Sequence, residues 1–113
     1  MSKKTVDLVQ GTLEFLIQKT LSRGAPMHGF NILQWIYEIT DEALQIEEGS
    51  LYPALHRMEK RKWIKADWAV SEKGRRAKYY ELTAAGRKRL THLEDQWNLY
   101  TAAVEKIVAS AET

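Results

Sequence analysis

The sequence contains no cysteine, which excludes disulfide bonds, thiolate catalysis and zinc sites with cysteine ligands. No run of apolar residues approaches the length of a transmembrane helix. The first residues also lack the continuous apolar segment of a signal peptide, so we expect a cytoplasmic protein without membrane contact. At 113 residues, the chain is long enough for one domain with a modest core.

The residue patterns of common catalytic and metal sites are missing as well. There is no Ser/His/Asp arrangement, phosphate-binding loop or dinucleotide fingerprint. The three histidines, His28, His56 and His92, are too scattered to suggest a metal site. The acidic pair Glu47 and Glu48 stands at the entry to an expected helix, where carboxylates favour the helix dipole. We therefore expect no enzyme, no cofactor and no metal.

Positive charge is absent from one long segment of the sequence and concentrated in the segment that follows it. The segment 24–56 contains no lysine or arginine. The segment 57–78 contains nine cations and only three anions; the cations are Arg57, Lys60, Arg61, Lys62, Lys65, Lys73, Arg75, Arg76 and Lys78. A chain of net charge +2 with its cations gathered in this way has the electrostatic footprint of a polyanion-binding protein.

The segment around residues 48–61 has the pattern of a short amphipathic helix. Leu51, Leu55 and Met58 recur on one face at 3.6 residues per turn. A proline is acceptable in the first turn, so Pro53 predicts a helix start near residues 48–50. The opposite face is small and polar at its start and cationic later, which suits a helix that enters a major groove and then approaches phosphates. The candidate groove contacts are Ser50, Tyr52, Pro53 and His56, and the phosphate contacts on this helix are Arg57 and Lys60.

Two of these candidates have structural alternatives. Ser50 is nearly as well explained as the N-cap of the helix. Tyr52 is equally well explained by packing on the hairpin that follows.

After this helix the apolar period changes from 3.6 to 2, which predicts a β-hairpin. Ile64, Ala66, Trp68 and Val70 alternate with polar or small neighbours, and the returning strand is expected over 78–82. Between them, Gly74 can adopt the positive φ that a hairpin loop usually needs. The loop region collects the cations Lys73, Arg75, Arg76 and Lys78. They are either a solubilising tip or, as we expect, a wing that lies along a nucleic-acid backbone.

Two further helices are expected before this unit, over 6–22 and 28–40. Val9, Leu13 and Leu16 belong to the apolar stripe of the first helix. Residues 24–26, Gly-Ala-Pro, are expected to end this helix. In the second, Trp35 widens the apolar arc, as in a helix that touches two partners or lines a pocket. We expect His28 either to cap the start of this second helix or to be solvated there, and we include it among the candidate phosphate contacts. The sequence therefore predicts a mainly α fold with a small β-hairpin, a winged helix-turn-helix.

A long final helix should follow. Thr83 is a good N-cap for it, and Gly86 near its start suggests close packing. Its apolar residues recur in steps of three and four, as in a coiled-coil seam: Leu90, Leu93, Trp97, Tyr100, Val104 and Ile107. The expected partner is a second copy of the chain, and the alternative is the chain's own first helix. We divide the chain into a winged helix-turn-helix (1–83) and a C-terminal dimerisation helix (84–113).

Several blocks of the sequence resemble the PadR family of transcriptional regulators. They are 8–13, 27–30, 48–59, 74–83 and 85–86, and they include Gly-Ser-Leu-Tyr-Pro-Ala-Leu and Gly-Arg-Arg-Ala-Lys-Tyr-Tyr. The single C-terminal helix is similar to the short branch of that family. The resemblance implies a winged-helix dimer, usually a repressor that binds an inverted-repeat operator in double-stranded DNA. It also implies that Ser50, Tyr52 and His56 face the groove, with the cations of the helix and hairpin on phosphates.

Two residues depart from the family pattern. Lys62 stands where the family usually has glycine, which costs on the order of 1 kcal/mol if the helix ends in a left-handed residue. Phe30 stands where tyrosine is common, so a hydroxyl is missing.

Some PadR-like regulators bind flat aromatic compounds between tryptophans at the dimer centre. Trp97 is similarly placed and is a candidate effector site, with Trp35 as a second candidate. Ordinary dimer packing by a large apolar side chain explains Trp97 equally well. The alternative function is a winged-helix module that binds a protein or a small ligand and not DNA.

Overall fold

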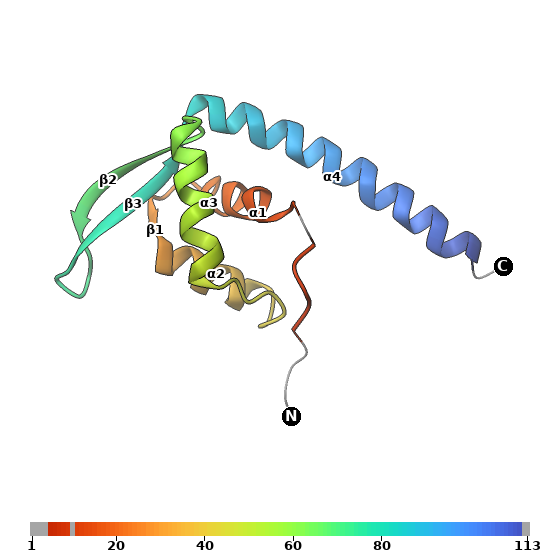
Figure 1. Cartoon of the computed structure of the whole chain (residues 1–113), viewed down its shortest axis with the longest axis horizontal. Coiled ribbons are helices and arrows are strands. Elements are labelled where there is room, and N and C mark those ends of the chain that lie inside the picture. Colours follow the sequence, from red (N-terminus) through yellow and green to blue (C-terminus); the bar gives the residue numbers. More distant parts are fainter. Residues whose placement is uncertain (1–4, 10, 112–113) are drawn as a thin grey trace.

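The computed structural model describes residues 5–9 and 11–111, which form a winged helix with a long C-terminal helix (Figure 1). The elements in chain order are α1 (Leu13–Leu21), β1 (Met27–His28), α2 (Gly29–Ile39), α3 (Glu48–Lys60), β2 (Ile64–Val70), β3 (Arg76–Leu82) and α4 (Ala84–Ala111). The predicted fold class is confirmed. In the described part of the chain, no helix is both long and apolar enough to cross a membrane.

The three strands form one antiparallel sheet in the order β1-β3-β2. In the hairpin, Ile64 pairs with Leu82 and Val70 with Arg76, so β3 begins two residues before the predicted start at Lys78. Gly74 has the expected positive φ, 75°. The sequence did not reveal β1, which pairs Met27 with Tyr80. A strand of two residues shows no periodicity, and only its partner defines it.

The predicted start of the first helix was wrong. α1 begins at Leu13 and not at Val6 (within the predicted helix, Gln10 lies outside the described residues). Gly11 has a φ of 87°, which is incompatible with a right-handed helix, and Thr12 then precedes the first helical residue. Val9 is 52 % exposed as a result and does not belong to the apolar stripe.

The helix α3 begins at Glu48, within the predicted range, but two details differ. Its N-cap residue is Glu47, so the alternative role of Ser50 as N-cap is wrong. Pro53 is the sixth residue of the helix and lies in its second turn. Because proline has no N–H, the Gly49 carbonyl loses the hydrogen bond it would otherwise accept there.

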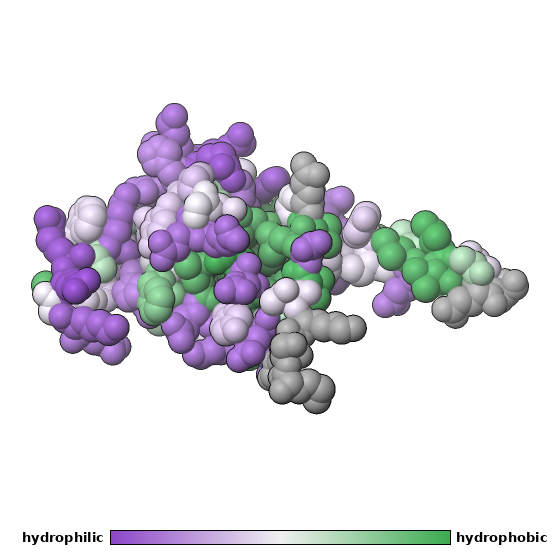
Figure 2. Space-filling view, turned by 60° about the horizontal axis from the view of Figure 1, so that its bottom comes forward, coloured by the Kyte–Doolittle hydropathy of each residue, from purple (hydrophilic) through white to green (hydrophobic). Residues whose placement is uncertain are grey.

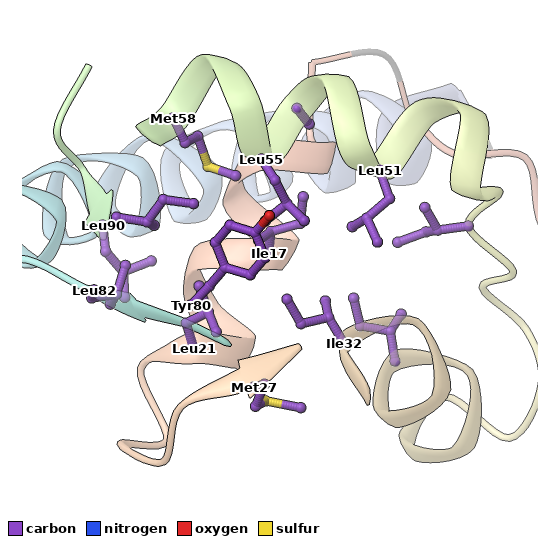
Figure 3. Packing of buried hydrophobic residues seen from close by; sticks show 14 residues of the cluster. Ile17, Leu21, Met27, Ile32, Leu51, Leu55, Met58, Tyr80, Leu82 and Leu90 are labelled. Atoms are coloured by element: carbon purple, nitrogen blue, oxygen red, sulfur yellow. The ribbon is translucent and has the colours of Figure 1, made fainter. Parts of the chain in front are cut away.

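The core lies between α1, α2, α3 and the base of the sheet (Figure 3). Leu51, Leu55 and Met58, the predicted apolar face of α3, are each at most 1 % exposed. They pack with side chains from every other element: Ile17, Leu21, Met27, Ile32, Ile36, Ile64, Tyr80, Leu82 and Leu90. The opposite face of α3, which carries Pro53 and His56, is therefore turned away from the hydrophobic core.

Lys62 connects α3 to β2 in the left-handed conformation, with a φ of 64°. Its N–H donates to the Glu59 carbonyl at 3.0 Å, and the Trp63 N–H donates to the Met58 carbonyl at 3.0 Å. These two bonds form a Schellman motif, which usually has glycine at the position of Lys62. The helix therefore ends in the glycine-type geometry, with a non-glycine residue under strain.

The start of α4 is fixed against this same connection. The Gly86 N–H donates to the Thr83 hydroxyl at 3.0 Å, which confirms Thr83 as the N-cap. The Thr83 hydroxyl donates to the Lys62 carbonyl at 2.6 Å. A Cβ atom at Gly86 would collide with the carbonyl oxygen of Trp63, so close packing explains this glycine, as expected.

Replacing Lys62 with glycine should stabilise the protein. Lys62→Gly removes the left-handed strain and keeps both backbone hydrogen bonds, so we expect a gain of about 0.5–1 kcal/mol in unfolding free energy. That gain corresponds to a rise in Tm of roughly 2–8 °C in a thermal melt followed by circular dichroism. The control is Lys60→Gly, at an exposed position within α3, which should lower Tm. An equal or lower Tm for Lys62→Gly would contradict the strain argument.

Candidate nucleic-acid interface

The outward face of α3 carries the predicted reading residues. Ser50, Pro53, His56 and Lys60 are all exposed. Pro53, His56 and Lys60 lie opposite the buried residues of the same helix, and Ser50 lies on its flank. His56 and Lys60 are one helical turn apart, so they form a continuous strip with Pro53. This part of the predicted set is brought together on one surface.

Tyr52 lies on the flank of α3 and leans against the start of α2. A Cβ atom placed on Gly29 would be 2.6 Å from the Tyr52 hydroxyl, so the ring covers Gly29. Burial raises the pKa of Tyr52, and the nearby carboxylate of Glu48 raises it further. The ring nevertheless remains 44 % exposed. Tyr52 thus packs on α2; the expected structural alternative was packing on the hairpin. The exposed part of the side chain remains on the surface.

The hairpin loop presents cations without acidic partners. The Ser71 N–H donates to the Arg75 carbonyl at 2.7 Å, and the Gly74 N–H donates to the Ser71 carbonyl at 2.9 Å, which closes the loop. Lys73 and Arg75 are exposed, and neither forms an ion pair within the described residues. The charge at this tip is therefore free to meet an external anion.

Trp68 is a residue of this surface that the sequence analysis treated only as part of the strand pattern. The side chain is 58 % exposed, and the Arg76 guanidinium lies over its ring at 5.0 Å. The neighbouring Val70 is 70 % exposed. The apolar face of the hairpin thus continues beyond the core. The sequence signal for it was the tryptophan and valine that continue the strand pattern up to the cationic loop.

A groove of about 830 Å³ separates the wing from the start of α2 and from α3. Its lining includes His28, Phe30, Tyr52, Trp68, Lys73 and Arg75. Phe30 is 54 % exposed and lies beside His28, with their ring centroids 6.4 Å apart. Aromatic faces and cations therefore line the same depression.

His28 is the N-cap of α2. Its Nδ1 accepts the Asn31 N–H at 3.2 Å, which leaves the ring proton of the neutral imidazole on Nε2. In this tautomer Nε2 is a hydrogen-bond donor, and His28 is among the residues that line the groove. The expected cap is confirmed, and the geometry is compatible with a donor to phosphate.

Two of the predicted phosphate contacts are already paired with carboxylates. Lys78 Nζ donates a hydrogen bond to Glu59 Oε1 at 2.9 Å, and this bond is the largest cause that raises the pKa of Lys78. Arg57 Nε lies 3.4 Å from Glu14 Oε2 of α1. Both cations were expected to be free, because the sequence does not show that Glu59 and Glu14, on other elements, lie beside them.

The predicted seam on α4 divides into two halves. Leu90 is 6 % exposed and belongs to the protomer's own core, so its assignment to a free dimer face is corrected. Leu93 is half-buried, and Trp97 packs on Phe15 of α1, with ring centroids 6.0 Å apart. Tyr100, Val104 and Ile107 are exposed, and a hydrophobic patch covers the far part of this helix in Figure 2.

The two candidate effector residues have different surroundings. Trp97 lies between Phe15 and Tyr100, which places three aromatic rings together. Trp35 on α2 lies under the Arg23 guanidinium at 4.4 Å. The described residues include no group of three or more His, Asp or Glu side chains placed to hold a metal ion.

A family model identifies the family of the chain, and several solved structures carry the same family name. Residues 17–92 match the model of the transcriptional regulator PadR-like family. A protein of Lysinibacillus sphaericus, named only as uncharacterized protein X, is 30% identical over 102 residues, which cover 90% of this chain and 89% of the relative.

Solved structures of regulators are similar over most of their length. A transcriptional regulator from Clostridium thermocellum has a TM-score of 0.79 and 31% identity, covering 89% of this chain and 97% of its own. A PadR-like transcriptional regulator from Bacillus cereus has a TM-score of 0.74 and 27% identity, covering 88% and 93%. A PadR family regulator from Clostridium difficile has a TM-score of 0.72 and 27% identity, covering 87% and 99%.

Proposed function

The chain belongs to the PadR-like family of transcriptional regulators, and from this premise we propose that it is a homodimeric repressor of a nearby operon. Regulators of this family bind DNA and are generally not enzymes. The proposed target is an inverted-repeat operator in double-stranded DNA. We place the protein in the cytoplasm, on the ground that it acts on the chromosome.

The observation that carries this proposal is the set of unpaired cations at the wing, beside the exposed face of α3. Lys73 and Arg75 have no acidic partner among the described residues, and Lys60 continues the reading face of α3 without one. Phosphate contacts of this kind supply most of the affinity for DNA. Ser50, Tyr52, Pro53 and His56 are the side chains that we assign to base edges in the major groove.

The remaining contacts are assigned to the backbone of the duplex. A phosphate strand that passes through the groove would meet the wing on one side and the Nε2 donor of His28 on the other. Trp68 and Arg76 would approach the sugar-phosphate backbone from the wing. This arrangement supports contact by both the hairpin and the start of α2.

The exposed end of α4 supports a dimer. Tyr100, Val104 and Ile107 form one face of the helix, and each is at least 38 % exposed in the single chain. A second copy is the natural cover for a self-complementary apolar face. We therefore divide the chain by function into 1–83 for DNA and 84–113 for dimerisation. Two copies would present two α3 helices to half-sites roughly 34 Å apart.

The most specific part of the proposal is that an aromatic compound acts as an effector. Phe15, Trp97 and Tyr100 cluster where α4 leaves the core, next to the proposed dimer face. A flat aromatic compound could stack there against Trp97. Trp35 lies in a separate environment under Arg23 and is the weaker candidate.

Removing cations from the wing should weaken binding to every duplex alike. We expect the wild-type protein to bind its own upstream region with steep salt dependence, and Lys73→Ala with Arg75→Ala to reduce the log–log slope by about 1.8. The measurement is a fluorescence-anisotropy titration at several salt concentrations. Lys65→Ala, on the other face of the hairpin, is the control. A wild-type slope near zero would argue for a module that does not bind DNA.

Tyr52→Ala should instead narrow the difference in affinity between operator and random DNA, because we assign this side chain to base edges. The same titrations measure both affinities.

A charge on the exposed face of α4 should separate the dimer. Val104→Asp with Ile107→Asp would place two carboxylates in the proposed interface, so we expect a monomer by sedimentation and at least a 100-fold loss of operator affinity. Ala102→Asp, on the opposite side of the helix, is the matched control and should remain dimeric. If the wild-type protein is monomeric at micromolar concentration, the dimer proposal is wrong.

Planar aromatic compounds should quench tryptophan fluorescence through Trp97. We expect saturable quenching of the wild-type protein and of Trp35→Phe, and its loss in Trp97→Phe, because stacking needs the indole of Trp97. A dye-like aromatic such as a phenazine can serve as the probe in the titration. Unchanged quenching in Trp97→Phe would remove the assignment.

A further inference from the structure

Lys78 lies on the wing, but its charge is already neutralised by Glu59 of α3. We propose that Glu59 holds Lys78 back from DNA and so limits the affinity of the protein for duplexes. This inference rests on the proposed DNA-binding function and adds a residue, Glu59, that acts through another side chain. Glu59 is thus a positioning residue for Lys78.

The geometry of the pair is well defined. Lys78 stands opposite Trp68 in the hairpin and lines the groove, so its side chain is on the side that faces α3. Its Nζ lies 2.9 Å from Glu59 Oε1, and both side chains are 32% exposed. The partial burial makes this pair stronger than a fully exposed surface pair. An incoming phosphate must therefore compete with a carboxylate that is already in place.

The position of Glu59 on α3 places a negative charge at the edge of the groove. Glu59 is seven residues from Tyr52, so the two side chains project from nearly the same flank of the helix. A carboxylate on this flank would repel a phosphate strand in the groove if it were not neutralised. Lys78 supplies that neutralisation, and the pair together contributes no net charge to DNA binding.

The other flank of α3 repeats the arrangement. Arg57 is engaged by Glu14 of α1, with Nε and Oε2 3.4 Å apart. By contrast, Lys73 and Arg75 at the tip have no such partner in the described part of the chain. Carboxylates thus neutralise one cation on each flank of α3, and the unpaired charge is left at the wing tip and at Lys60 on the outward face of the helix.

The test compares the salt dependence of DNA binding in variants of the whole 113-residue chain. Glu59→Gln should free Lys78 for one additional phosphate, which steepens the log–log slope by about 0.9 and tightens binding roughly 8-fold at 0.1 M salt. Glu14→Gln should act in the same direction through Arg57. Glu81→Gln is the matched control, because the Lys65–Glu81 pair has a similar distance of 3.2 Å but lies on the other face of the hairpin. It should leave slope and affinity unchanged.

A double-mutant cycle separates this inference from direct phosphate contact by Lys78. Lys78→Gln should weaken binding by leaving Glu59 unneutralised, and Glu59→Gln with Lys78→Gln should return affinity and slope to wild-type values. If Lys78 contacts phosphate in the wild type, the double variant keeps a slope about 0.9 shallower than wild type, and the inference is overturned. Thermal melts of each variant establish that it is folded.

The outcome also separates this inference from the proposed function. A wild-type slope near zero would refute DNA binding itself. A steep wild-type slope that Glu59→Gln does not change would refute only the role of Glu59.

Discussion

The hydrogen bonds around residues 62 and 63 are the constraint on which the rest of the structure depends. The Thr83 N–H donates to the Trp63 carbonyl at 3.1 Å, and the Thr83 hydroxyl donates to the Lys62 carbonyl. The same carbonyl of Trp63 leaves no room for a side chain at Gly86. The end of the reading helix, the first hairpin strand and the start of α4 therefore meet at one point. Because the groove face, the wing and the proposed dimer face belong to these three elements, their relative directions are set there.

The cations around α3 and the wing differ in whether a carboxylate neutralises them. On the flanks of α3, Arg57 and Lys78 are held by carboxylates at 3.4 Å and 2.9 Å, whereas Lys60 on the outward face has no acidic partner among the described residues. At the wing tip, Lys73 and Arg75 stand on a loop closed only by backbone and serine hydrogen bonds. The unpaired positive charge thus lies at the tip and at the end of α3, whereas the flanks of α3 carry charges that are already paired. The division matters for selectivity, because phosphate contacts alone do not distinguish one DNA sequence from another.

The sequence predicted those parts of the fold that depend on local periodicity. Leu51, Leu55 and Met58 located α3, and Gly74 located the hairpin loop, because spacing and backbone preference are written in the chain itself. It failed for β1, which is defined only by its pairing with β3, and for Lys78, whose partner is 19 residues away on another element. The family blocks identified the candidate site, but they did not show which of its cations are already neutralised.

The division of α4 into a packed half and a free half has a mechanical consequence. The helix contains 28 residues and is therefore about 42 Å long. Its first turns are anchored at Gly86 and Leu90, and the rings of Phe15 and Trp97 meet near its middle. A tilt of 10° about the anchored end displaces the far end by about 7 Å. Any change in the ring packing at that midpoint is thus amplified along a rigid lever arm.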